Sequence, residues 1–303
     1  MTAVARQADT ATTLAWLNAA EPAAFVASLG SVFEHSPWVA EAVAGQRPFA
    51  SVQALHEAML AVIRAQPADR LRAFLSVHPE LAGSQARAGT MTVDSVEEQG
   101  GLALDALGDA ENARWDALNA AYRGKFGFPF ILCVRRHTRA SALRRFEVRL
   151  GNHLATEMAE AVDEIARVSR LRMATRVADH RLPRLHGRLT VQVRDGSRDL
   201  PASAMRVELR EFGAPGGQPL LRTATGPDGA TPDPLMAGAP LRIGQYELSL
   251  HVGDYFRSRG GAEPTLLDVV PVRFQLAEAE GHYHVPVEVS PDGYRARVLA
   301  VPA

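Results

Sequence analysis

The sequence of 303 residues contains one cysteine, few aromatic residues and no long apolar run. With Cys133 alone, the chain cannot form an intrachain disulfide bond or a cysteine-rich zinc site. No apolar stretch reaches the roughly 20 residues that a membrane-spanning helix needs. The 33 basic and 34 acidic residues nearly cancel, which leaves no excess of positive charge for nucleic acid or anionic lipid. We therefore expect neither nucleic acid nor a membrane among its partners.

The two ends of the sequence carry no recognisable targeting signal. Arg6 and Asp9 interrupt the N-terminal stretch, which lacks the continuous apolar core of a signal peptide. The final Val-Pro-Ala is not a peroxisomal signal of the Ser-Lys-Leu type. We expect a cytoplasmic protein, and its length suggests two domains.

The first half has the hydrophobic pattern of helices. Apolar side chains recur every three to four positions from residue 51 to 65 and again from 154 to 173. Prolines punctuate the segments between, as they do between helices. This pattern predicts an all-α domain over residues 1–174.

The pattern changes after residue 174. Residues 175–188 are basic, contain Pro183 and Gly187 and lack a sustained apolar period, which predicts a linker. From residue 189 onward, apolar and polar side chains alternate in short runs separated by Gly- and Pro-rich turns. Such runs are typical of an antiparallel sandwich with one face of each strand in the core. We predict an all-β domain over residues 189–303.

Five segments of the predicted helical domain occur in the order found in one known family. They are residues 33–39 (FEHSPWV), 78–83 (HPELAG), Ser95 with Glu98-Gln99, 126–135 (FGFPFILCVR) and 149–165 (RLGNHLATEMAEAVDEI). Together they resemble the 2-oxo-4-hydroxy-4-carboxy-5-ureidoimidazoline (OHCU) decarboxylase family. The resemblance implies a helical lyase that converts OHCU to (S)-allantoin in urate breakdown.

The resemblance also implies roles for single residues. His78 is expected to be the catalytic histidine, with Glu98 and Gln99 as an acidic–amide pair that acts with it. Arg135 is expected to grip the substrate, and the adjacent Arg136 is its alternative. The residues expected to bind substrate are Pro79 and Ser95.

These residue types suit a decarboxylation. The carboxylate of OHCU stands beside a ring C=N bond, which can accept the electron pair that departing CO2 leaves behind, so we predict no cofactor. An imidazole that titrates near neutral pH suits proton transfer, and a guanidinium can bind oxygens with two parallel donors. Whether His78 or Glu98 transfers the proton stays open.

The second half carries the segments of another family. They are residues 191–195, 200–202, 225–229, 244–248, 253–256 and, most specific, 282–286 (HYHVP). They resemble the transthyretin-like family, which includes 5-hydroxyisourate hydrolase. The resemblance implies a transthyretin-like sandwich, and the hydrolase acts one step before OHCU decarboxylase.

The hydrolase site itself is degenerate in this sequence. Gln192 stands where the hydrolase has a histidine, and Ala230 stands where it has an arginine. The terminal Tyr-Arg-Gly-Ser is replaced by YRAR at residues 294–297, so only His284 of the expected catalytic set remains. Glutamine cannot act as a base near neutral pH and alanine donates no hydrogen bond, so we predict that the hydrolase activity is lost.

Other interpretations of the second half remain open. A bifunctional enzyme would still hydrolyse 5-hydroxyisourate with a rearranged site built on His284, whereas a non-catalytic domain would serve binding or oligomerisation. The family associates through sheet edges, so we expect a homo-oligomer. His282 and His284, with His251 as a third ligand, could bind a metal; we predict none, because no carboxylate partner is evident.

Overall fold

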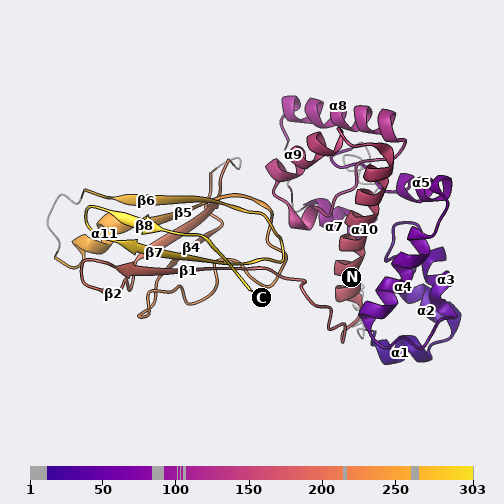
Figure 1. The fold of residues 1–303 in the computed structure, drawn as a ribbon, viewed down its shortest axis with the longest axis horizontal. Helices are drawn as coiled ribbons and strands as arrows, with labels where there is room; N and C mark the ends of the chain where they lie inside the picture. The colour runs from indigo at the N-terminus through magenta and orange to yellow at the C-terminus, as the bar shows by residue number, and fades with distance from the viewer. Residues whose placement is uncertain are drawn as a thin grey trace, which may run out of the picture. The chain divides into compact units, whose positions relative to one another are not determined.

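The computed structural model of the chain describes residues 12–83, 92–100, 102, 104, 107–213, 217–260 and 266–302, without the side chains of residues 93, 97 and 99. The chain divides into two compact units (Figure 1). The first comprises Met1–Cys133 and Phe146–Pro183, and the second comprises Val134–Arg145 and Arg184–Ala303.

The first unit is built of helices, as the sequence predicts. They are α1 (Leu14–Ala19), α2 (Pro22–Leu29), α3 (Trp38–Ala44), α4 (Val52–Arg64), α5 (Ala68–Ser76), α7 (Val93–Gly100), α8 (Asp109–Phe126) and α10 (Leu154–Arg176). The division between the units falls within α9 (Arg139–Arg149). Both helices predicted in detail are confirmed, α4 for residues 51–65 and α10 for residues 154–173.

Local sequence explains how α4 begins and which face it buries. The Ser51 hydroxyl accepts a hydrogen bond from the Ala54 N–H at 3.0 Å and so caps the first turn. Leu55, Met59 and Ile63 recur at helical spacing and are fully buried.

The long helix α10 organises the first unit. Its C-terminal half packs beside α4 (Figure 1). There the Ser169 hydroxyl oxygen lies 2.8 Å from His56 Nε2. Its N-terminal half packs beside α8, where the Tyr122 hydroxyl donates to Glu157. Residues that come together at either end of α10 therefore lie far apart in the sequence.

A buried ion pair joins α9 to the N-terminal half of α10. Arg149 and Glu157 are both completely buried, and Arg149 Nε donates to Glu157 Oε1 at 2.9 Å. Asn152 Nδ2 donates to the other carboxylate oxygen at 2.7 Å, and Tyr122 donates to the first. Arg149 Nη1 also donates to the Ile131 carbonyl at 2.8 Å, so this network holds the FGFPFILCVR segment.

The second unit is a two-layered β-sandwich. Its elements are β1 (Arg188–Asp195), β2 (Leu200–Pro201), β3 (Arg206–Glu211), β4 (Leu221–Ala224), β5 (Gly244–His251), the short helix α11 (Val252–Arg257), β6 (Val269–Leu276), β7 (His282–Val289), β8 (Tyr294–Ala296) and β9 (Leu299–Val301), together with the 3-10 helix η2 (Val134–Arg136). One sheet has the order β2-β1-β7-β8, with β9 also paired to β7, and the other has the order β4-β3-β5-β6.

The alternating pattern of the sequence corresponds to the core of the sandwich. Leu189, Val191 and Val193 of β1 are buried, whereas the residues between them are not. The strand pairs of the described residues are antiparallel with one exception. β1 and β7 run parallel, in register from Arg188↔His282 to Asp195↔Val289. The predicted antiparallel sandwich is confirmed apart from this one pair, which could not be foreseen because alternation reveals the buried face of a strand but not its direction.

Residues 134–145 make their contacts with the sandwich. The Thr138 N–H donates to the Ile243 carbonyl at 3.0 Å, and the Ile243 N–H donates to the Arg136 carbonyl at 2.7 Å. Arg136 binds Glu280 through two hydrogen bonds of 2.9 and 2.6 Å. This bidentate pair gives Arg136 a structural partner within the second unit.

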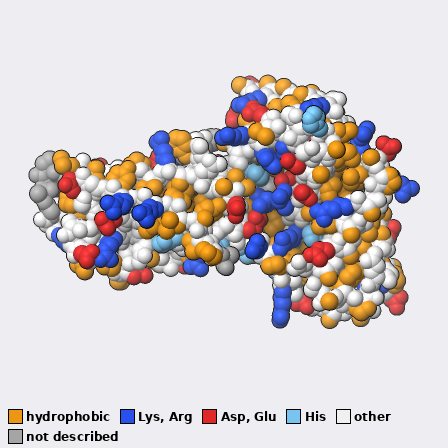
Figure 2. Space-filling model, in the orientation of Figure 1, with side chains coloured by type: hydrophobic (Ala, Val, Ile, Leu, Met, Phe, Trp, Pro, Cys, Tyr) orange, Lys and Arg blue, Asp and Glu red, His pale blue; other side chains and the backbone are white. Residues whose placement is uncertain are grey.

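The surface follows the balanced charge of the sequence. On the face that Figure 2 shows, blue basic and red acidic side chains lie close to one another over the strands of the sandwich, in keeping with a formal net charge of −1. Among the described helices, none is both long enough and apolar enough to cross a membrane.

Candidate functional site

His78 lies just beyond the end of α5. The helix ends at Ser76, and Pro79 prevents its continuation because proline disfavours helical geometry in the residue before it. The His78 N–H donates to the Leu75 carbonyl at 3.4 Å. The imidazole stands edge-on to the Phe74 ring, with the ring centroids 5.4 Å apart. The end of α5 thus fixes where the imidazole lies.

α8 anchors the HPELAG segment, residues 78–83. The buried Asn119 side chain donates from Nδ2 to the Leu81 carbonyl at 2.9 Å. Arg123 Nε donates to the Glu80 carboxylate at 2.7 Å. The turn that carries the histidine is therefore held by side chains from a neighbouring helix.

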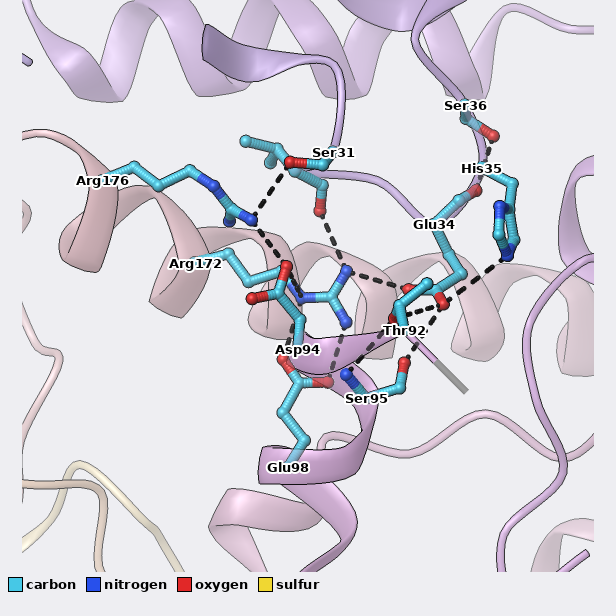
Figure 3. Close-up of polar contacts among 11 residues, drawn as sticks. Ser31, Glu34, His35, Ser36, Thr92, Asp94, Ser95, Glu98, Arg172 and Arg176 are labelled. Carbon is cyan, nitrogen blue, oxygen red and sulfur yellow. Dashed lines mark hydrogen bonds and ion pairs between the residues drawn. The ribbon is translucent and has the colours of Figure 1, made fainter. Parts of the chain in front are cut away.

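A cluster of polar side chains surrounds Arg172, near the end of α10 (Figure 3). Arg172 donates through Nε and Nη2 to the two oxygens of Glu98, at 2.8 and 2.9 Å. Its Nη1 donates to the Glu34 carboxylate at 3.2 Å and to the Val32 carbonyl at 3.4 Å. One guanidinium on α10 thus binds both α7 and the segment that precedes α3. We call Glu34, Ser95, Glu98 and Arg172 the carboxylate–arginine cluster.

Glu34 is the buried centre of the carboxylate–arginine cluster, with only 4% of its surface exposed. Its Oε1 accepts hydrogen bonds from the Thr92 hydroxyl at 2.7 Å and the Ser95 hydroxyl at 3.2 Å. Ser95 and Glu98 stand three residues apart on α7 and share one face of that helix. From this face, Ser95 donates to the Glu34 carboxylate, whereas Glu98 accepts from the Arg172 guanidinium.

The electrostatics of the site make the His78 imidazole neutral at pH 7. Burial lowers the pKa of His78 from 6.5 to about 4; the Glu34 carboxylate opposes this shift, and the Arg172 guanidinium adds to it. His78 Nδ1 is buried and has no hydrogen-bond partner among the described residues. A neutral imidazole carries one N–H and one lone pair, so this ring can offer either to a ligand.

A second histidine of the first unit is also held neutral. Burial, helped by Arg170, lowers the pKa of His56 from 6.5 to about 4. Its Nε2 lies 2.8 Å from the Ser169 hydroxyl. Its hydrogen-bond partner and the charges that act on it, from Arg170, Glu57 and Arg64, all lie outside the carboxylate–arginine cluster, which makes His56 a matched comparison for His78.

The lowered pKa values of His56 and His78 predict acid sensitivity. Between pH 6.5 and 4 the unfolded chain binds protons at both rings that the folded chain does not bind, so the free energy of unfolding falls as the pH falls. Each histidine should contribute roughly 1–3 kcal/mol above pH 6.5 that is lost by about pH 4. Urea unfolding followed by the helical circular dichroism measures this slope. In His56→Gln the slope should be shallower; an unchanged slope would contradict the prediction.

The three positions aligned with the hydrolase site lie in one region of the sandwich. Gln192 and Ala230 form an isolated antiparallel bridge, and Gln192 Nε2 donates to the Asp228 carbonyl at 3.2 Å. His284 on β7 pairs with Thr190 of β1, and its Nδ1 lies 2.9 Å from the Thr190 hydroxyl oxygen. Residues 190 and 192 share one face of β1, so the amide, alanine and imidazole occupy the same face.

A pocket of about 310 Å³ opens beside Gln192. Its charged lining residues are Arg194, Asp228, Glu288, Arg295 and Arg297. Among the described residues that line it there is no histidine, so the pocket offers no imidazole base.

The described residues contain no group of three or more His, Cys, Asp or Glu side chains able to hold a metal ion. His282 and His284 lie on β7, whereas His251 lies on β5 of the other sheet, where Arg206 contacts its Nδ1. The geometry of the described residues therefore does not favour the three-histidine alternative.

Models of two known families match the two halves of the chain. The family model of OHCU decarboxylase matches residues 18–174. The chain belongs to the OHCU decarboxylase family. The model of the HIUase/Transthyretin family matches residues 189–296, in agreement with the sandwich of the second unit.

Individual relatives agree with this assignment. The chain is 37% identical over 158 residues to the putative OHCU decarboxylase of Homo sapiens, covering 52% of this chain and 91% of the human protein. It is 36% identical over 158 residues to the uric acid degradation bifunctional protein PucL of Bacillus subtilis, covering 52% of this chain and 31% of that protein. A solved (S)-allantoin synthase is 29% identical with a TM-score of 0.51, covering 95% of this chain and all of that chain.

The structure of this OHCU decarboxylase family member brings several predicted site residues together. Ser95 and Glu98 belong to the carboxylate–arginine cluster. His78 lies close enough to this cluster for the charges of Glu34 and Arg172 to shift its pKa. Pro79 follows His78 and is partly buried. Gln99 lies on α7, but its side chain is outside the described residues. Arg135 belongs to η2 in the second unit and has an exposed side chain.

Two members of the cluster were not predicted as site residues. Glu34 lies within the FEHSPWV segment, which contributes to the family resemblance. The sequence does not reveal that its carboxylate is buried. Arg172 lies on α10 beyond the segment 149–165 and falls between Leu171 and Met173, both buried. An arginine on an apolar stretch of a helix was the available signal, because a charge there needs a partner.

Proposed function

We propose that this chain decarboxylates OHCU to (S)-allantoin in urate degradation. The observation that carries the proposal is a neutral His78 whose buried Nδ1 has no hydrogen-bond partner among the described residues and whose pKa is shifted by the charges of Glu34 and Arg172, within a chain of the OHCU decarboxylase family. The relatives named as OHCU decarboxylases and the solved (S)-allantoin synthase support the same reaction.

The chemistry of OHCU explains what the site has to do. The bond between C4 and the carboxylate breaks, its electron pair forms a C4=C5 double bond, and the ring C=N bond moves its pair onto nitrogen, which takes a proton. The 4-hydroxyl then loses its proton to become a carbonyl, and C5 gains one. Each turnover releases CO2 and takes up one proton from solvent. The ring is its own electron sink, so we propose a reaction without a cofactor.

We assign the second proton transfer to His78. A neutral imidazole can accept the 4-hydroxyl proton at one time and, as imidazolium, deliver a proton to C5. Delivery from one side of the ring yields a single enantiomer of allantoin. Glu98 is the other candidate for a proton carrier, and Arg172 holds its carboxylate by two hydrogen bonds.

We add Arg172 to the residues proposed for the site and keep those predicted from the resemblance. Among the described residues, Glu98, Glu34 and the Val32 carbonyl take four of its five N–H groups, so we propose that the remaining Nη2 hydrogen binds an oxygen of the substrate. The roles of the other predicted residues stay proposals: Pro79, Ser95, Gln99 and Arg135.

We propose that the sandwich does not hydrolyse 5-hydroxyisourate. Gln192 and Ala230 occupy two positions of the aligned catalytic set, and neither side chain can replace a base or a guanidinium. The neighbouring pocket has no histidine among its described lining residues. His284 alone, paired with Thr190, leaves the site short of the groups that hydrolysis needs.

We also propose that the protein works as a cytoplasmic homo-oligomer. Apolar side chains at the end of the sandwich support self-association: Tyr294, Leu299 and Val301 are 50%, 43% and 45% exposed on β8 and β9. The one cysteine is buried and free, as expected in a reducing compartment.

The assay that tests this function couples three enzymes. Urate oxidase generates 5-hydroxyisourate, an independent hydrolase converts it to OHCU, and the full chain is added at that point. We expect the circular dichroism of (S)-allantoin to develop faster than the spontaneous racemic decay. Without the independent hydrolase, the decay of 5-hydroxyisourate should keep its spontaneous rate. Faster decay there would mean that the sandwich is catalytic; no enantiomeric excess in the complete assay would reject the decarboxylase function.

A further inference from the structure

We propose that Glu34 is a positioning residue of the decarboxylase site, which fixes the Arg172 guanidinium and through it the Glu98 carboxylate. This inference rests on the proposed decarboxylase function. Glu34 does not need to touch the substrate to act in this way. Its role follows from where its two carboxylate oxygens bind.

The two edges of the Arg172 guanidinium are held by different groups. Nε and Nη2 bind Glu98, whose side chain is 17% exposed. Nη1 binds Glu34, whose side chain is 3% exposed, and the Val32 carbonyl. A pair with Glu98 alone could swing as a unit toward solvent. The second, buried anchor sets the plane of the guanidinium.

Glu34 is itself fixed from another side. Its Oε1 accepts from Thr92 and Ser95 at the start of α7, whereas its Oε2 accepts from Arg172 on α10. The same carboxylate therefore links the helix that carries Glu98 to the helix that carries Arg172 (Figure 3). Loss of its charge would loosen the guanidinium while leaving both helices in place.

A nearby acid does not duplicate this contact. Asp94 binds Arg176 at 2.6 Å and lies 4.0 Å from Arg172 Nε, on the edge that Glu98 already occupies. Among the described residues, Glu34 supplies the carboxylate for the Nη1 edge. Replacing it by glutamine keeps the size and the acceptor for the two hydroxyls but removes the charge that holds Nη1.

Glu164 provides a matched control. It is also 4% exposed, its carboxylate also binds one arginine, Arg167, and it also lies in the first unit. Its other oxygen accepts from the Cys133 N–H at 2.9 Å. Glu164→Gln thus removes a buried, arginine-paired carboxylate outside the carboxylate–arginine cluster.

The first experiment is a double-mutant cycle in the OHCU assay with the full chain. Glu34→Gln should lower kcat/KM by about 10- to 100-fold, mostly through kcat, since the reacting groups are misplaced. Arg172→Lys removes the planar fork, so adding Glu34→Gln to it should cost no more than about threefold further. Glu164→Gln should stay within about twofold of the parent in either background.

Two results of this cycle would overturn the proposal. One is a Glu34→Gln enzyme with unaltered kcat/KM. The other is an equal loss in the parent and Arg172→Lys backgrounds, because a general defect of folding is additive whereas a defect transmitted through Arg172 is not.

A second measurement needs no turnover and separates this proposal from the proposed function. Exchange of the Arg172 Nε–H with water, followed by proton–nitrogen NMR, should be about tenfold faster in Glu34→Gln and unchanged in Glu164→Gln. Unchanged exchange in Glu34→Gln would reject the positioning role even in an active enzyme. An inactive parent chain with this exchange pattern would reject the decarboxylase function and retain the role of Glu34 in holding Arg172.

Discussion

Replacing His78 by asparagine is expected to lower kcat for OHCU decarboxylation by about 1,000-fold, to near the spontaneous rate. Asparagine is polar and of similar size, so it can remain beside Phe74, but it cannot accept and release a proton at pH 7. The measurement is the formation of (S)-allantoin from OHCU by circular dichroism, with the spontaneous rate subtracted.

Variants of two other histidines distinguish a loss of proton transfer from a general loss of structure. His56 is buried and has its pKa lowered to about 4, as His78 has, yet it bonds to Ser169. His56→Gln should therefore lower stability and leave kcat within about twofold. His284→Ala alters the sandwich and should leave decarboxylation unchanged. Equal losses of kcat in the His56 and His78 variants would remove the reason for placing the chemistry at His78.

The largest loss of stability is expected from Arg149→Met. The substitution leaves the Glu157 carboxylate completely buried without its guanidinium, and removing one partner of a buried pair costs about 3–5 kcal/mol. It also strips the Ile131 carbonyl of its donor. Urea unfolding followed by the helical circular dichroism should report this fall in the free energy of unfolding.

Two comparison variants show whether the uncompensated charge is the cause. Adding Glu157→Gln to Arg149→Met should recover part of the loss, because glutamine is neutral and its one carbonyl oxygen can still accept from Tyr122. Arg114→Met breaks an ion pair with Glu147 that is about half exposed and should cost under about 1 kcal/mol. A similar cost for the exposed and the buried arginine would contradict the role given to burial.

The sequence predicts much of the fold because local patterns determine it. Leu55, Met59 and Ile63 recur with helical spacing and form the buried face of α4, and the alternating residues of β1 form the core of the sandwich. The parallel pairing of β1 with β7 could not be predicted in this way. It joins strands from opposite ends of the sandwich sequence, and neither strand's alternation records the direction of its partner.

The candidate site could be predicted in part, where its residues lie in short motifs. His78, Ser95 and Glu98 were singled out in that way, and the structure places the last two on one face of α7. Arg172 could not be predicted from a motif, because it is distinguished by its contacts with Glu34 and Glu98, which lie far away in the sequence. The neutral state of the His78 imidazole likewise depends on residues that are far apart in the sequence. The expectation of an imidazole that titrates near pH 7 is replaced by a pKa of about 4, since burial depends on the packed structure.

The release of labelled CO2 tests the central claim most directly. OHCU carrying carbon-13 in its carboxylate is generated in place from labelled urate, and the label is followed by NMR as carbon dioxide and bicarbonate while allantoin forms. The full chain should accelerate loss of the label in step with (S)-allantoin formation, and the His78→Asn chain should not. Release of the label at the spontaneous rate in the presence of the folded, full-length chain would contradict the central claim.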